Sequence, residues 1–210
     1  MGENFFTVGT GVTDITPPRG VPYLGIRPRH PACSGVHDPL HARAVVVGNK
    51  TSSVAIISAE LIGLINTILG PARNFTGEVR GLVEKRTGIS RAAVMLSCVH
   101  AHSTPDSIAI RPLRENNTAR AWLETLADRV AHSVVLAMEN RFDARMKIGG
   151  TDVPGFARNR RGNDSLDERM TVLLFESPDR NRAILLAHFA CHPVIVQVQD
   201  QVSADFPGAF

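Results

Sequence analysis

The sequence has few cysteines, few aromatic residues and no long apolar run. Its three cysteines, Cys33, Cys98 and Cys191, are an odd number, which favours reduced thiols over a disulfide framework. No stretch approaches the roughly 18 consecutive apolar residues of a membrane helix, so we expect no transmembrane segment. The first residues lack the basic and apolar regions of a secretory signal. We therefore expect a cytoplasmic protein, or a secreted or periplasmic one if the N-terminus was trimmed.

Signatures of nucleotide and nucleic-acid binding are also missing. The sequence contains neither a Walker loop nor a Gly-x-Gly-x-x-Gly segment after an apolar strand. The net charge of +3 comes mainly from scattered arginines, with one local cluster at Arg158, Arg160 and Arg161. Because a nucleic-acid interface needs a concentrated basic surface, we expect no nucleic-acid partner. The composition leaves the oligomeric state open.

Apolar runs and helical stripes alternate along the chain. Apolar runs predict strands at residues 6–16, 44–47, 53–58, 94–99, 145–149, 170–175 and 183–187. Apolar residues at three- and four-residue steps predict helices at 71–87 and 118–140. This order predicts an α/β fold in which mixed β-sheets flanked by helices form a single layered domain over residues 1–210. The entry to an unfinished helix at 203–210 predicts an incomplete fragment.

Two pairs of histidines follow apolar runs. Residues 94–99 lead into His100 and His102, and residues 183–187 lead into His188 and His192. In an extended segment residues i and i+2 face the same side, about 6.6 Å apart at Cα, so two imidazoles can point into one site. A lone His-x-His is more often a pair of hydrogen-bonded loop histidines, but the second pair favours a metal such as zinc.

Four separate motifs occur in the order found in one known family. They lie at residues 11–17, 35–43, 99–105 and 188–194. Over almost the whole chain the sequence resembles the N-terminal catalytic region of neutral (alkaline, non-lysosomal) ceramidases. One departure is Thr104 in Ser103-Thr104-Pro105, where the family usually has Ser-Gly-Pro. This residue argues against a backbone conformation there that only glycine adopts.

The resemblance implies a zinc-dependent amide hydrolase that splits N-acylsphingosine into a fatty acid and a sphingoid base. The nucleophile would be a zinc-bound water, and the substrate a lipid-like N-acyl amide. By motif, His100 and His192 are the implied zinc ligands. The other two ligands of the family, a Glu and a Tyr, would lie beyond residue 210, so we expect this chain by itself to be catalytically poor or inactive.

Further site residues are implied by the same resemblance. His102 would line the site as a proton donor or a substrate contact, and Asp14 matches a functional-looking Asp on the family's opening strand. The dipeptide Asn159-Arg160 resembles one that carries the family's substrate-contacting arginine. Arg160 fits the alternative interpretation, a solvated loop residue, equally well. His37 is a candidate substrate contact, but the Asp38-Pro39 step beside it also fits a simple turn.

The residues leave two alternatives to an amidase. A phosphoesterase would use Asp14, Asp38 and Asp205 beside the histidines to hold two metals. The chain could also be a non-catalytic fragment. One geometric condition applies to the amidase: if the imidazoles of His100 and His192 lie more than about 7 Å apart, they cannot share one zinc at about 2.1 Å per bond.

Overall fold

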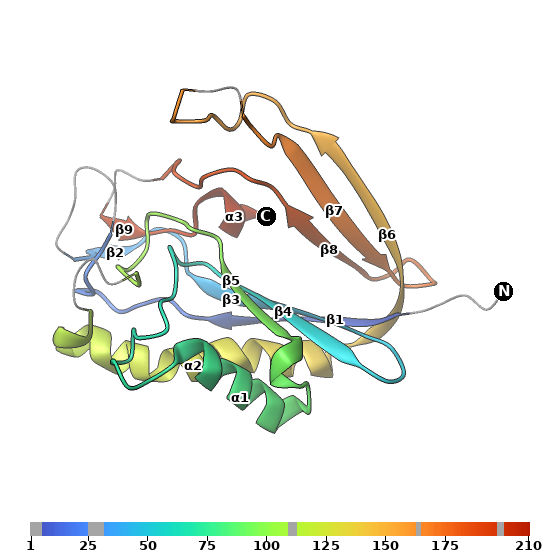
Figure 1. Cartoon of the computed structure of the whole chain (residues 1–210), viewed down its shortest axis with the longest axis horizontal. Helices are drawn as coiled ribbons and strands as arrows, with labels where there is room; N and C mark the ends of the chain where they lie inside the picture. The colour runs from blue at the N-terminus through green and yellow to red at the C-terminus, as the bar shows by residue number, and fades with distance from the viewer. Residues whose placement is uncertain (1–5, 25–31, 109–112, 163–164, 197–199) are drawn as a thin grey trace.

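The computed structural model describes residues 6–24, 32–108, 113–162, 165–196 and 200–210, and most of its strands lie in one sheet (Figure 1). The strands of this sheet are β1 (Phe6–Asp14), β3 (His41–Gly48), β4 (Ser53–Ala59), β5 (Val94–Cys98), β6 (Phe142–Asp152), β7 (Arg169–Glu176) and β8 (Ala183–His188). Their spatial order is β5-β4-β3-β1-β6-β7-β8. A second, parallel pair joins β2 (Gly35–Val36) to β9 (Gln201–Val202). The mixed sheet confirms the predicted α/β fold class.

The helices are α1 (Phe75–Thr87), α2 (Asn117–Glu139) and the short α3 (Asp205–Ala209), with 3-10 turns at Arg91–Ala93 and Leu113–Glu115. The predicted start of the first helix at residue 71 is wrong, because the Asn74 side chain accepts the N–H of Gly77 at 2.8 Å and caps the helix. The predicted end is confirmed: Gly88 has φ 75° and donates its N–H to Glu84. The Asn116 side chain caps α2 in the same way.

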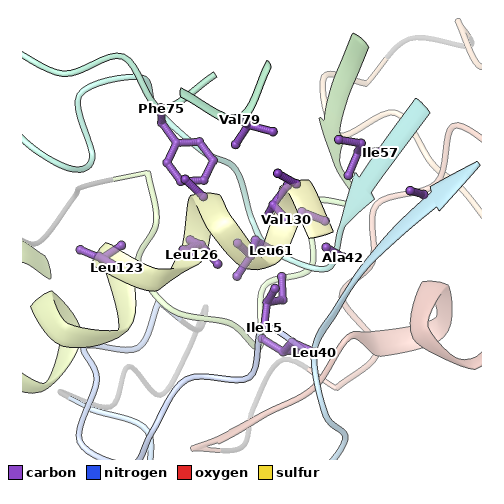
Figure 2. Close-up of a cluster of buried hydrophobic side chains, with 14 of the residues drawn as sticks. Ile15, Leu40, Ala42, Ile57, Leu61, Phe75, Val79, Leu123, Leu126 and Val130 are labelled. Atoms are coloured by element: carbon purple, nitrogen blue, oxygen red, sulfur yellow. The ribbon is translucent and has the colours of Figure 1, made fainter. Parts of the chain in front are cut away.

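The main core lies between one face of the sheet and the helices α1 and α2. Strand β3 alternates, with Ala42, Ala44 and Val46 buried on this face. Figure 2 shows Ile57 of β4, Phe75 and Val79 of α1, and Leu126 and Val130 of α2 meeting there. The predicted hairpin is confirmed, because β3 and β4 pair antiparallel from Ala42–Ala59 to Gly48–Ser53.

The sheet curls so that β6, β7 and β8 rise on the side opposite α1 and α2 (Figure 1). A smaller core of Val8, Ala144, Phe175 and Ile184 lies on that side. Strand β6 is longer than the predicted 145–149, because it pairs with β7 from Arg145 to Asp152 while most of its side chains are exposed and give no apolar pattern. Within the described part of the chain, no helix has both the length and the apolar character needed to cross a bilayer.

Candidate metal centre

His100 is held by the backbone at the end of β5. Strands β4 and β5 run parallel, and the chain leaving β5 donates the N–H of His100 to the carbonyl of Leu61 at 3.0 Å. The ring Nδ1 of His100 lies 2.7 Å from the carbonyl oxygen of Ile62. A carbonyl oxygen can only accept, so Nδ1 carries the proton and Nε2 is the nitrogen free to bind a metal.

His102 and His192 meet His100 although they come from distant parts of the chain. The Nε2 atoms of His102 and His192 are 2.9 Å apart. The ring centroid of His100 lies 5.3 Å from that of His102 and 5.2 Å from that of His192. One nitrogen from each ring lies within 4.8 Å of the others. The predicted convergence of His100 and His192 is therefore confirmed, and His188, which is exposed, is outside this group.

The three-histidine group has the properties of a donor set for a metal. Burial is the main cause that lowers the pKa of His102 to about 4, and the neighbouring His192, His100 and Arg160 add to it. The pKa of His192 is lowered as well, first by burial and then by Arg160 and His100. Neutral imidazoles bind metal. The buried Nδ1 of His102 has no hydrogen-bond partner among the described atoms, whereas its Nε2 faces His192.

The lowered pKa of His102 predicts how the stability of the metal-free protein depends on pH. Between the ordinary value of 6.5 and about 4, the unfolded chain binds a proton that folded His102 does not. The free energy of unfolding should therefore fall as the pH falls through this window. Urea titrations at several pH values across this window should show that the free energy of unfolding depends less on pH for His102→Gln than for the unsubstituted protein. Parallel curves for the two proteins would contradict the prediction.

Arg160 and Asp205 lie close enough to the histidines to affect them electrostatically. Arg160 lowers the pKa of both His102 and His192, whereas Asp205 raises both. Asp205 is buried with φ 57°, and its carboxylate accepts the N–H of Val196 at 2.8 Å and of Phe206 at 2.7 Å. The loop that carries Arg160 contacts the His192 segment, because the Sγ of Cys191 donates to the carbonyl of Phe156 at 3.4 Å. Arg160 is exposed.

The other candidate site residues from the sequence have recorded contacts with residues outside the three-histidine group. Asp14 accepts the N–H of Thr16 and interacts electrostatically with His41 and Arg129. His37 is exposed, with its Nδ1 2.8 Å from Asp38. The Asn159 side chain donates to the carbonyl of Ser165 at 3.0 Å and accepts the N–H of Arg161 at 2.8 Å. The roles of Asp14, His37 and Asn159 stay predictions.

Thr104 stands where the resemblance implied a glycine. Its φ is not positive, as expected from the sequence. The buried hydroxyl accepts the N–H of Ile62 at 3.1 Å and donates to the carbonyl of Ala101 at 2.9 Å. Thr104 thus links the loop that carries His102 to the segment that holds His100.

The cysteines are not part of the histidine group. All three are free thiols. Burial raises the pKa of Cys98 to about 12 and also raises that of Cys191. Because the thiolate is the reactive form, neither thiol is suited to act as a nucleophile at neutral pH.

Comparisons with known proteins give a match in structure but not in sequence. No protein-family pattern and no curated protein sequence matches the chain. The neutral ceramidase of Pseudomonas aeruginosa is 19% identical and superposes with a TM-score of 0.81 over 99% of this chain. A ceramidase complexed with C2 is also 19% identical, with a TM-score of 0.76 over 98% of this chain. The chain spans only 35% and 34% of these two structures. The resemblance to ceramidases is thereby confirmed for the fold.

Proposed function

We propose that this chain supplies the metal-binding part of a ceramidase-like, zinc-dependent amide hydrolase. The observation that carries the proposal is the convergence of His100, His102 and His192, with one nitrogen of each ring within 4.8 Å of the others. The shared fold with two ceramidase structures supports the same class of reaction. The substrate we infer is a lipid-like N-acyl amide such as N-acylsphingosine.

Zinc fits the donor set because imidazole nitrogen is one of its usual ligands. Zinc bound there would polarise an amide carbonyl and lower the pKa of a coordinated water, which is the chemistry that a stable amide bond needs. In this proposal His100 and His192 hold the metal. The closeness of His102 to His192 favours His102 as a third ligand. The alternative role of His102, as a proton donor, stays a prediction.

The charged residues around the histidines have separate proposed roles. Arg160 places a guanidinium near the histidines, where it can bind the oxygen of an amide carbonyl and stabilise negative charge that develops on it. Asn159, next to it, would contact the substrate. The carboxylate of Asp205 holds the backbone that follows His192 through the N–H of Val196.

A single-metal site is better supported than the two-metal site of a phosphoesterase. Among the residues that the structure describes, one group of three metal-capable side chains is close enough to share an ion, and it contains no carboxylate. Two-metal phosphoryl-transfer sites hold their ions about 3.5–4 Å apart. Asp14, Asp38 and Asp205, the carboxylates that a phosphoesterase would use, all lie outside the histidine group, which supports the amidase.

The test uses the gene product that contains this sequence. After loading with zinc, we expect one zinc per chain and release of fatty acid from a fluorescent N-acylsphingosine, and both should be lost in His100→Ala. His132→Ala, which removes an exposed histidine of α2, is the matched control and should keep both properties. Two metals per chain, with hydrolysis of p-nitrophenyl phosphate and none of the amide, would overturn the proposal.

A further inference from the structure

A buried carboxylate lies just outside the histidine group. Glu60 directly follows β4, and its side chain is 2% exposed. Its Oε2 accepts the backbone N–H of His41 at 2.6 Å, and its Oε1 accepts Nε–H of Arg43 at 2.6 Å. A buried charge is tolerated when it is paired and hydrogen-bonded in this way. Both oxygens thus tie the chain after β4 to the neighbouring strand β3.

The two residues after Glu60 are those that hold His100. The carbonyl of Leu61 accepts the backbone N–H of His100, and the carbonyl of Ile62 accepts its ring Nδ1–H. The N–H of Ile62 donates in turn to the hydroxyl of Thr104. The segment 60–62 is therefore anchored by Glu60 on one side and by Thr104 on the other.

His100 needs such an anchor because its backbone conformation is unfavourable. Its φ of 68° lies in the left-handed region, which few residues other than glycine adopt. A residue stays in this region only where its surroundings determine it, and strain of this kind is concentrated at functional sites. At His100 the described partners that do so are the two carbonyls of segment 60–62.

We propose that Glu60 is a positioning residue for His100. Its anchored carboxylate fixes the Leu61 carbonyl, which holds the backbone of His100, and the Ile62 carbonyl, which keeps Nδ1 protonated and so leaves Nε2 for the metal. The inference rests on the proposed function for the identity of the metal, whereas the orientation of the ring can be measured without one. Glu60 itself does not touch the substrate or the metal in this scheme.

The experiment compares Glu60→Gln with Glu78→Gln. Glutamine keeps the size of the side chain but places an NH2 group either against the backbone N–H of His41, whose ring Nδ1 also lies 3.2 Å from Oε2, or against Nε–H of Arg43. Glu78 of α1 accepts two bonds from Arg73 at 2.8 and 2.6 Å. Its substitution also removes a carboxylate–arginine pair, but one that is about one-third exposed and away from the site. In metal-free protein, long-range 1H–15N NMR should show a single Nδ1–H tautomer for His100. We expect Glu60→Gln to mix the two tautomers and Glu78→Gln to leave one.

Zinc affinity, measured by competition with a chelator, is the second readout. Substitution of residues that orient metal ligands typically costs tenfold to a hundredfold in affinity, so we expect the Kd of Glu60→Gln to rise at least about tenfold. Glu78→Gln should stay within about twofold of the unsubstituted protein. Arg43→Lys, which weakens the contact of Arg43 with Oε1 of Glu60, should give an intermediate shift and serves as the test variant if Glu60→Gln does not fold.

The outcomes separate the inference from the proposed function. Loss of stability in Glu60→Gln with an unchanged His100 tautomer and unchanged zinc affinity would show that Glu60 is only structural, and the inference would be overturned. If the unsubstituted protein binds no zinc, the proposed function fails, but the tautomer still decides whether Glu60 positions His100.

Discussion

Replacing His192 with alanine is expected to weaken zinc binding more than about a hundredfold, a larger effect than that of removing a residue that only orients a ligand. His192 is remote in sequence from His100 and His102, and tertiary structure places its Nε2 2.9 Å from that of His102. Its loss would leave only His100 and His102 of the three-histidine group, and these two imidazoles come from one short segment. Competition with a fluorescent chelator measures the Kd.

The matched control is again His132→Ala, whose side chain is exposed on α2. It should bind zinc as tightly as the unsubstituted protein, which excludes non-specific binding to surface histidines. Equal affinities of His192→Ala and His132→Ala would show that the three-histidine group is not the metal site.

The second large effect is expected at Gly11, where β1 touches the backbone of α2. A Cβ on Gly11 would lie 2.1 Å from the carbonyl oxygen of Ser133 and 2.5 Å from the backbone nitrogen of Ala137. Backbone atoms in a packed helix cannot move aside singly, so Gly11→Ala must push α2 away from the sheet. We expect it to lower the free energy of unfolding by about 3 kcal/mol or more, as severe overpacking does. Urea denaturation measures the change.

Gly149→Ala is the control for Gly11→Ala. Gly149 also lies in a strand, β6, but a Cβ there would meet no atom within 4 Å. Because alanine restricts the unfolded chain, the control should keep or raise the free energy of unfolding by up to about 1 kcal/mol. A Gly11→Ala protein as stable as the control would show that α2 does not pack on β1 as closely as described.

Much of the secondary structure is predictable because it depends on local periodicity. The apolar stripe of α2 and the alternation along β3 are visible in the sequence, and both elements form within a few residues of the predicted positions. The prediction fails where the signal is not apolar. Strand β6 is held mainly by pairing with β7 and exposes most of its side chains, and α1 begins late because Asn74 caps it.

The parts of the site that act through backbone contacts are not visible in the sequence. Glu60 differs from an ordinary surface acid only in following a buried strand directly, and its importance lies in the carbonyls of the next two residues. The left-handed conformation of His100 is likewise determined by tertiary contacts, since histidine has only a weak local preference for it. The closeness of Arg160 and Asp205 to His102 depends on segments that are remote from it in sequence.

The sequence by itself determined that histidines stand at the ends of two strands, because apolar runs and the polar residues that stop them are local signals. It did not determine that these ends meet. Strands β5 and β8 are the opposite edges of the seven-stranded sheet, so in a flat sheet His102 and His192 would be far apart. Only the curl of the sheet, which carries β6–β8 over the face opposite the helices, brings their Nε2 atoms to 2.9 Å (Figure 1).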